Sequence, residues 1–564
     1  MSKSVFIVLL CILFLAIGFW LGRGKDNGPT LQSYQSYRHL PKVSVTAKTV
    51  DEQEGSSEVS AADYAEGAPA FAGESNESAA VKKIATAVKS TNFPFIEGEL
   101  VLRPKEGVSQ AELIALLKER GIAVIGDIPE LDLIRVVLPD DMKVGDAEKF
   151  LKEKDAVSET VRNAPVTLEP APVAENIRQG VPVGSSALKL MSGEIIGKGR
   201  DGAGILVAVL DTGVDDSHPS LAGQTFGGYD IVNDMAFVSD NNGHGTACAS
   251  LIAGKGGEGG VLGAAPKAQI LPVKVMDDSG KSDGFAIAKG IVYAVEKGAK
   301  IINLSLGTTS ETTLLDSAIE YALGKGVLIV AASGNEGKEG ENYPSTIDGV
   351  LCVGAVDGEK WEAAFSNYGP KVDLVAPGVL VAAAAPGGGA VLMSGTSSAA
   401  PLVSGAAASV WSENPNWSSE KVTEKLMAEA DDLGSPGADD WYGAGLVNMY
   451  RALRTIKEKD LALSSLYFDP PELIQGEKSE MVAVFQNRGT ERIVDGAAVI
   501  KIDDHEEKVL LPHLEPGASA EVRRSFNLPE GRAKKEMYME IKAEASSDAR
   551  YENNGKRILI SKER

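Results

Sequence analysis

The chain has 564 residues, which is too long for one hydrophobic core, so about three or four domains are expected. A formal net charge of −23 argues against a nucleic-acid binder and against adsorption to anionic lipid, because both need a basic surface. The three cysteines, Cys11, Cys248 and Cys352, have neither the spacing of a disulfide framework nor that of a zinc site.

Residues 1–25 contain an apolar run without charges, Val5 to Gly22, which is just long enough to span a bilayer. Its place at the start of the chain also suits a cleaved signal peptide, although the small residues suited to cleavage lie inside the run. We expect a signal anchor and export of the rest of the chain, either as a membrane-anchored extracellular protein or as one secreted after processing. Positive charges on both sides leave the orientation open.

Residues 26–92 are predicted to be a disordered tether. Eight acidic and no basic residues lie between Asp51 and Glu77, mixed with Ser, Ala and Gly. Such a composition cannot bury enough apolar surface to fold by itself. The tether would hold the following domain away from the membrane.

Residues 93–166 predict a small α+β domain. The stretches "FIEGELVLRP" and "LDLIRVVLP" are typical of strands, and "VGDAEKFLKEK" is typical of a helix. A helix over "SQAELIALLKERG" has Ser109 as its N-cap and Gly121 as its stop signal. The chain then continues in extended form through "ETVRNAPVTLEP" into a linker over residues 167–181.

Residues 182–457 predict an α/β domain with a parallel sheet and helices on both faces. Its apolar runs are continuous rather than alternating, which is typical of strands covered on both sides. The runs are "ILVAVLD", "QILPVKVM", "KIINLSL", "VLIVAASG", "GVLCVGAV" and "VDLVAPG". Polar motifs follow the first, third and fourth runs, at the strand ends where such sheets place their functional side chains. Residues 463–564 alternate instead, which predicts a β-sandwich without a cluster of reactive side chains.

Asp211 ends the first of these runs in an Asp-Thr-Gly turn, which allows two hypotheses. In an aspartic protease it would share a proton with a second carboxylate, for which Asp278 in "DDSG" is the candidate. However, Asp278 comes only 67 residues later in a chain that alternates strands and helices. Aspartic proteases are rich in strands and place their two turns on related lobes. This hypothesis also leaves the other polar motifs unexplained.

Three further polar residues support the second hypothesis, in which Asp211 orients a histidine. His244 stands between two glycines in "NGHGT", which lets other groups approach its ring closely. Ser397 in "GTSSAAP" enters a helix of small residues, where it is either an N-cap or a nucleophile beside backbone N–H groups. Asn335 in "AASGNEG" follows a buried strand, where it is either a turn residue or an oxyanion donor.

The chain order Asp211, His244, Asn335, Ser397 and the sequence around these residues resemble the subtilisin-like serine proteases. The matching blocks are "VAVLDTGVDDSHP", "NGHGTACAS", "INLSLG", "AASGNEG" and "GTSSAAP". The resemblance implies an endopeptidase in which Ser397 attacks the peptide carbonyl to form an acyl-enzyme. His244 would be the general base and Asp211 the acid that orients it. Asn335 and the backbone N–H of Ser397 would stabilise the oxyanion.

The resemblance also implies that an extended polypeptide substrate binds by strand addition to two edge segments. The expected substrate-binding residues are Gly280, Ser282, Gly284, Ser305, Leu306, Gly307, Ser333 and Gly334. No cofactor is expected. Calcium is not expected at the place usual for the family, where Ser220 replaces an Asp and Glu258 is the only carboxylate of the following loop. Calcium sites elsewhere stay open.

Residues 93–166 are similar to the inhibitory propeptides of this family, and residues 463–564 resemble immunoglobulin-like (CARDB-type) modules of surface proteins. The protein would then be a zymogen whose own pro-domain occupies the cleft until self-cleavage between about Val161 and Gln179. Two alternatives are a catalytically silent surface-binding protein on a protease scaffold and an esterase or peptide ligase with the same triad. The sequence does not define the partner of the sandwich.

Overall fold

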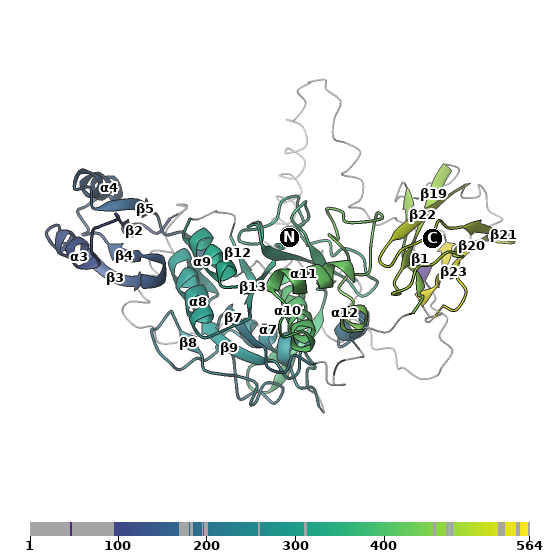
Figure 1. The fold of residues 1–564 in the computed structure, drawn as a ribbon, viewed down its shortest axis with the longest axis horizontal. Helices are drawn as coiled ribbons and strands as arrows, with labels where there is room; N and C mark the ends of the chain where they lie inside the picture. The colour runs from purple at the N-terminus through teal and green to yellow at the C-terminus, as the bar shows by residue number, and fades with distance from the viewer. Residues whose placement is uncertain are drawn as a thin grey trace, which may run out of the picture.

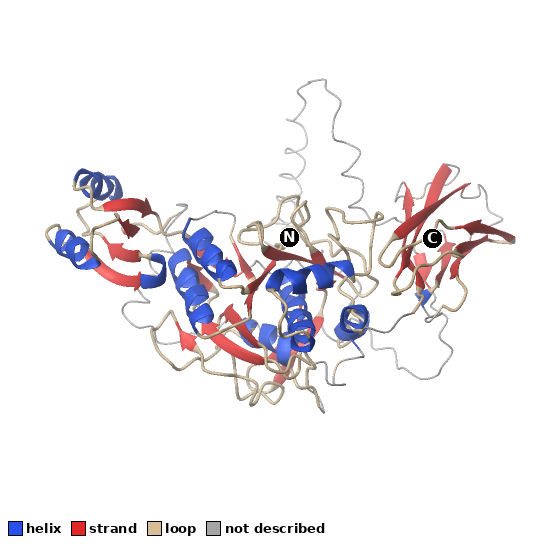
Figure 2. Cartoon of the chain, viewed as in Figure 1, coloured by secondary structure: helices blue, strands red, loops and turns tan. Residues whose placement is uncertain are grey.

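The computed structural model describes residues 45–47, 95–168, 180, 184–193, 196, 201–257, 260–308, 313–454, 458–469, 473, 478–527, 536–548 and 553–561. Figure 1 shows a small α+β domain in purple and blue, a central α/β domain, and a β-sandwich in green and yellow. Helices flank the central sheet, whereas the C-terminal part is built from strands (Figure 2). The predicted fold class is confirmed.

Seven parallel strands form the central sheet, in the spatial order β15-β14-β13-β11-β7-β9-β8. Their bounds are Leu206–Asp211 (β7), Tyr229–Asp230 (β8), Gln269–Lys274 (β9), Ile301–Leu304 (β11), Leu328–Ala332 (β13), Val350–Val356 (β14) and Leu374–Pro377 (β15). Six of them coincide with the six apolar runs of the sequence, because these strands are almost wholly buried. The edge strand β8 is too short to leave such a signal.

Helices cover both faces of this sheet. Their bounds are Ala187–Leu190 (α6), His244–Ala253 (α7), Gly284–Glu296 (α8), Thr313–Gly324 (α9), Thr396–Glu413 (α10), Ser419–Ala428 (α11) and Met449–Leu453 (α12). Successive residues of a strand point to opposite faces. Val207 of β7 therefore packs with α7 and α10, whereas its neighbour Ala208 packs with α8 and α9.

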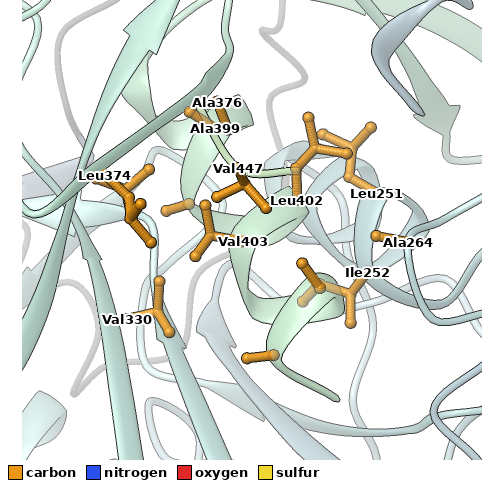
Figure 3. Close-up of a cluster of buried hydrophobic side chains, with 14 of the residues drawn as sticks. Leu251, Ile252, Ala264, Val330, Leu374, Ala376, Ala399, Leu402, Val403 and Val447 are labelled. Carbon is orange, nitrogen blue, oxygen red and sulfur yellow. The ribbon is translucent and has the colours of Figure 1, made fainter. Parts of the chain in front are cut away.

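The two helices that carry polar motifs, α7 and α10, pack against the sheet through one common core. Figure 3 shows part of it, where Val403 of α10, Ile252 of α7 and Val330 of β13 belong to one buried cluster. A hairpin of β16 (Val381–Ala385) and β17 (Gly389–Met393) precedes α10. Because α7 and α10 share this core, the positions of His244 and Ser397 at their first turns depend on each other.

The small domain has the element order βαββαβ. Its elements are β2 (Glu99–Pro104), α3 (Gln110–Lys118), β3 (Ala123–Ile128), the turn η3 (Pro129–Leu131), β4 (Leu133–Val137), α4 (Val144–Glu153) and β5 (Val157–Val161), with antiparallel sheet order β3-β4-β2-β5. Ser109 caps α3 in a capping box with Glu112, as predicted. Strand β3 is an addition that the sequence patterns did not indicate. Val101 and Leu133 share a core with α8 and α9 of the central domain.

Beyond β5 the chain enters the central domain as β6, Pro165–Leu168. This strand lies in the middle of a three-stranded antiparallel sheet between β10 (Lys281–Asp283) and β12 (Leu306–Gly307). Thr167 lies opposite Lys281 on one side and opposite Gly307 on the other. The segment that was predicted to be extended is thus a strand added to two edges of the central domain.

The C-terminal sandwich has one sheet of three strands and one of five. The strands are β18 (Leu461–Asp469), β19 (Lys478–Asn487) and β22 (Ser519–Asn527), and β1 (Val45–Ala47), β24 (Gly555–Ser561), β23 (Glu536–Glu544), β20 (Ala497–Ile502) and β21 (His505–Leu510). Strand β1 belongs to the predicted tether but pairs with β24, and its purple ribbon lies in the yellow sandwich of Figure 1. The tether prediction is therefore wrong at these three residues, where β-branched Val45 and Thr46 favour an extended backbone.

Several predictions fall on residues outside the described ranges. They include the apolar run Val5 to Gly22, most of the tether, and most of the linker between Glu169 and the central domain. Among the residues that are described, no helix is both long and apolar enough to cross a membrane.

Candidate active site

Asp211 is the last residue of β7, at the carboxyl end of the central sheet, and its side chain is fully buried. One carboxylate oxygen accepts a hydrogen bond from the backbone N–H of Thr212 at 2.7 Å. The turn after Asp211 packs tightly against the first turn of α7. A Cβ added to Gly245 would lie 2.0 Å from the carbonyl oxygen of Gly213, so only glycine allows this approach.

His244 begins α7, and its imidazole faces Asp211. The Nδ1 atom lies 2.9 Å from each carboxylate oxygen of Asp211. Burial lowers the pKa of His244, but the adjacent Asp211 carboxylate outweighs this effect and raises the pKa well above its usual value. A histidine held in this way presents its other ring nitrogen, Nε2, away from the carboxylate.

Ser397 is the second residue of α10, so it is not the N-cap, which is Gly395. The local alternative of a capping serine is therefore wrong. The carbonyl oxygen of Ser397 accepts hydrogen bonds from Cys248 Sγ at 3.6 Å and from Ser305 Oγ at 3.2 Å. Cys248 Sγ also lies 3.8 Å from His244 Nδ1, so the start of α10 is in contact with α7 beside the imidazole.

Asn335 lies three residues beyond β13, and its side chain reaches the start of α10. Its Oδ1 accepts hydrogen bonds from Thr396 N at 2.8 Å and from Thr396 Oγ1 at 3.0 Å. These bonds fix which end of the amide points toward Ser397. A Cβ at Gly395 would lie 2.8 Å from Ser397 Oγ and 3.1 Å from Asn335 Nδ2, which places both groups around one small space. Gly395, with φ of 142°, keeps that space open.

The two predicted edge segments flank β6. The carbonyl oxygen of Gly280 accepts a hydrogen bond from the Leu168 N–H at 2.8 Å, and Leu306 lies opposite Leu168 on the other side. Gly284 donates its backbone N–H to the carbonyl oxygen of Ala164 at 2.9 Å. Both segments therefore pair with an extended strand of the chain itself. That they bind a substrate remains a prediction.

The other predicted binding residues are held by protein groups. The hydroxyl of Ser333 is fully buried and donates to the carbonyl oxygen of Asn367 at 3.1 Å. Ser282 donates its hydroxyl to the carbonyl oxygen of Val275. Gly334 has φ of 115°, and a Cβ there would collide with the amide of Asn367. These residues shape the loops beside the site rather than offering side chains to a ligand.

The sequence predicted Cys248 only as a core residue. The structure shows that this core residue also lies beside His244. Asp211, His244 and Cys248 form a group of three potential metal ligands within the described part of the chain. Their ligand atoms lie within 4.8 Å of one another. The spacing of four residues between His244 and Cys248 on α7 was the available signal, because residues i and i+4 share a helix face. Burial raises the pKa of the Cys248 thiol.

At the family's usual calcium position, the described residues do not supply a ligand set. Ser220 Oγ already accepts a hydrogen bond from the backbone N–H of Val261 at 3.0 Å. The described part of the loop from Gly254 to Gly263 carries no carboxylate, and Glu258 lies outside the described residues. Calcium prefers several oxygen ligands, and the expectation that it does not bind there stays a prediction from the sequence.

An acid, an imidazole and a serine at the carboxyl end of a parallel sheet, with an amide beside the serine, define an α/β serine hydrolase. Residues 202–445 match the subtilase family (Peptidase S8). The chain is 40% identical over 304 residues to a thermostable alkaline protease of Halalkalibacterium halodurans, covering 54% of this chain and 80% of that protein. It is 41% identical over 276 residues to subtilisin Savinase of Lederbergia lenta, covering 49% of this chain and all of that protein. It is 38% identical over 255 residues to thermitase of Thermoactinomyces vulgaris, covering 45% of this chain and 90% of that protein.

The chain belongs to the subtilase family, and it is a serine endopeptidase that acts on polypeptides. The alternative of a catalytically silent scaffold is not supported. Asp278, the candidate second acid of an aspartic dyad, instead forms an ion pair with Lys274 at 2.8 Å.

Proposed function

We propose that this endopeptidase cleaves peptide bonds with Ser397 as nucleophile, His244 as general base and Asp211 as its orienting acid. The observation that carries the proposal is the pair of 2.9 Å contacts between His244 Nδ1 and the Asp211 carboxylate. That carboxylate accepts a hydrogen bond from Nδ1–H, which leaves Nε2 as the nitrogen that takes the proton from Ser397. The protonated imidazole is then stabilised by the buried charge of Asp211.

The tetrahedral oxyanion is stabilised by the side-chain N–H of Asn335 and by the backbone N–H of Ser397. The hydrogen bonds from Thr396 to Asn335 Oδ1 support this assignment, since they turn the Nδ2 end of the amide toward Ser397. The position of Ser397 in the first turn of α10 adds the favourable end of the helix dipole. When the intermediate collapses, the peptide C–N bond breaks, His244 gives its proton to the leaving amine, and the acyl-enzyme remains. Water then hydrolyses the acyl-enzyme with the neutral His244 again as base.

The substrate binds as an extended chain between β10 and β12. Support comes from β6, which makes antiparallel pairs with both strands in the described structure. Recognition through main-chain hydrogen bonds accepts many sequences, so broad specificity for unfolded polypeptides is expected.

The protein is made as an exported zymogen in which residues 93–166 inhibit the active site. The occupation of the substrate strands by β6 supports this assignment, as does the core that Val101 shares with α8 and α9. Self-cleavage between about Val161 and Gln179 would separate the catalytic domain from the N-terminal segment. The apolar run Val5 to Gly22 supports export, as an anchor or as a cleaved signal.

The test compares the wild-type chain with Ser397→Ala, both expressed alone. The wild type is expected to be trimmed to a catalytic fragment that a fluorophosphonate labels at Ser397 and that digests a denatured protein. The alanine variant should stay at full length and remain unlabelled. Trimming of the alanine variant in isolation would disprove self-processing, and an unlabelled but folded wild type would disprove the proposed mechanism.

A further inference from the structure

Lys274 is a buried cation next to the triad acid. It is the last residue of β9, lies opposite Asp211 in the parallel pairing of β9 with β7, and is only 2% exposed. Burying an ammonium group is costly unless partners compensate its charge. The chemical steps proposed above do not use this charge, so its partners are informative.

The ammonium group joins two loops. Its Nζ donates to the carbonyl oxygen of Thr212, in the turn after Asp211, at 2.5 Å. It also lies 2.8 Å from Oδ1 of Asp278, which sits in the turn that leads into β10. Lys274 therefore connects the turn that carries Asp211 to the turn that precedes the substrate strand.

Asp278 extends this connection to the histidine. Its Oδ2 accepts a hydrogen bond from Asn241 Nδ2 at 3.0 Å, and its carbonyl oxygen accepts one from Asn242 Nδ2 at 3.0 Å. Asn242 Oδ1 in turn accepts the backbone N–H of His244 at 3.2 Å. Asp278 therefore contacts both the loop that leads into α7 and the ammonium group of Lys274.

The same turn ends in the strand that pairs with an extended chain. The Asp277 carboxylate accepts the backbone N–H groups of Ser279 and Lys281, which makes the turn compact. Gly280 then binds the N–H of Leu168 through its carbonyl oxygen. Movement of Asp278 would therefore displace both β10 and the His244 loop.

We propose that the ion pair of Lys274 and Asp278 is a positioning device that holds the Asp211 turn, the His244 loop and the substrate strand β10 in one register. The inference rests on the proposed function and names two residues that act through others rather than on the substrate. Its consequence is that the carbonyl of a chain held by β10 arrives at a fixed distance from His244 and Ser397. A small displacement of that kind costs far more rate than stability.

Two physical features support positioning over simple stabilisation. An ion pair in the interior adds little stability compared with apolar residues of the same size, so stability alone does not explain it. Burial raises the pKa of Asp278, but the hydrogen bonds from Lys274 and Asn241 outweigh this and hold the pKa below its usual value. The carboxylate is therefore charged at any pH at which His244 is neutral.

The test uses Asp278→Asn and Lys274→Met in the full chain, with Lys267→Met as the matched control. Lys267 forms an ion pair with the buried Asp201 at 2.7 Å and precedes the opposite end of β9, away from the site. Each matured variant is assayed on a peptide long enough to pair with β10 and on a small activated ester that does not reach it. We expect kcat/KM on the peptide to fall about 10-fold in both test variants and by less than about 3-fold on the ester. The control should match the wild type on both substrates.

The pH dependence of kcat/KM on the ester adds a second readout. His244 faces Asp211 and Cys248, and both of these groups are unchanged in all variants. Asp278→Asn leaves the Lys274 cation uncompensated and should move the acid limb to lower pH, whereas Lys274→Met leaves an anion and should move it to higher pH. If the ion pair contributed only to stability, the acid limb of both variants would lie at the same pH as in the wild type.

The outcomes are distinguishable from failure of the proposed function. A wild type without activity contradicts the proposed function itself. An active wild type whose two variants keep its peptide-to-ester ratio and its acid limb overturns the positioning role. If Lys274→Met does not fold, Asp278→Asn decides the matter, because the Asp278 side chain is 33% exposed and tolerates substitution better.

Discussion

Arg488 of the β-sandwich forms an ion pair with Asp431 of the central domain, with 3.0 Å between Nε and Oδ1 and both side chains almost fully buried. Beside this pair, Gln486 accepts the backbone N–H of Asp432 and donates to the carbonyl oxygen of Ala430. The sandwich is therefore docked onto the central domain through polar groups that water does not reach.

The first prediction is that Arg488→Met destabilises the matured enzyme. Asp431 would keep Asn448 and the more distant cations of Lys360 and Arg451 as partners, and breaking a buried ion pair typically costs about 3–5 kcal/mol. The measurement is the free energy of unfolding in urea, followed by loss of activity and by fluorescence. The control is Arg523→Met, whose ion pairs lie on the exposed surface of the sandwich and should contribute less than about 1 kcal/mol. Equal stability of Arg488→Met and the wild type would contradict this docking.

The second prediction concerns Asn335. Asn335→Ala removes one proposed oxyanion donor, so kcat on a peptide substrate should fall by about 10²–10³ with little change in KM. Asn414→Ala is the matched control, because Asn414 lies at the other end of α10 and its side chain donates to the carbonyl oxygen of Val410, away from the site. A rise in KM with unchanged kcat would instead assign Asn335 to ground-state binding.

The parts of the molecule that could be predicted share a local signal. The strands β7 and β13 are continuous apolar runs. The motifs around His244 and Ser397 are recognised from the residues next to them and from their order along the chain. Strand β3 lacked such a signal because most of its side chains are exposed, which leaves no apolar period to recognise. The partner of Asp278 could not be predicted from the sequence. Lys274 reaches the turn after Asp211 because β7 and β9 are parallel neighbours whose last residues, Asp211 and Lys274, lie opposite each other.

The third prediction is a pH profile. A general base works only when neutral, and Asp211 raises the pKa of His244 well above its usual value. Consequently kcat/KM should fall as the pH drops through this raised pKa, which places the optimum on the alkaline side. Asp211→Asn should move the acid limb to lower pH and reduce kcat by about 10⁴, measured with a peptide substrate in buffers of constant ionic strength. An acid limb that stays in place in Asp211→Asn would disprove this pairing as its cause.

The fourth prediction is reversible inhibition by zinc. Zinc binds thiolate, imidazole and carboxylate, and a zinc ion at Asp211, His244 and Cys248 would remove the imidazole from catalysis. Because burial raises the pKa of the Cys248 thiol and binding releases its proton, inhibition should strengthen as the pH rises. Cys248→Ser should raise the half-inhibitory zinc concentration by about 10-fold, whereas Cys352→Ser, in the core strand β14, should leave it unchanged. Inhibition that persists equally in Cys248→Ser would place the zinc elsewhere.

The fifth prediction concerns the contact between the small domain and the catalytic domain, where two carboxylates share one guanidinium. Arg135 Nη2 lies 2.7 Å from Glu99 of its own domain and 3.0 Å from Asp283, which begins the turn into α8. Asn163 donates to Glu99 at 3.1 Å and accepts the backbone N–H of Phe285. One positive charge thus faces two negative ones in a site with almost no exposure.

Burial raises the pKa of Glu99, Arg135 lowers it and Asp283 raises it again, with a net upward direction. A carboxyl whose pKa is higher in the docked state binds a proton on docking. Docking is therefore strongest below the ordinary pKa of Glu99 and weakens as the pH rises through the raised value. The measurement is the dissociation constant of the small domain, added as a separate polypeptide, from the matured enzyme whose Ser397 has been blocked with a fluorophosphonate, across this pH range. Glu99→Gln should bind without this pH step, whereas Glu153→Gln, on the solvent side of α4, should keep it. The same pH dependence in the wild type and in Glu99→Gln would assign the proton to another group.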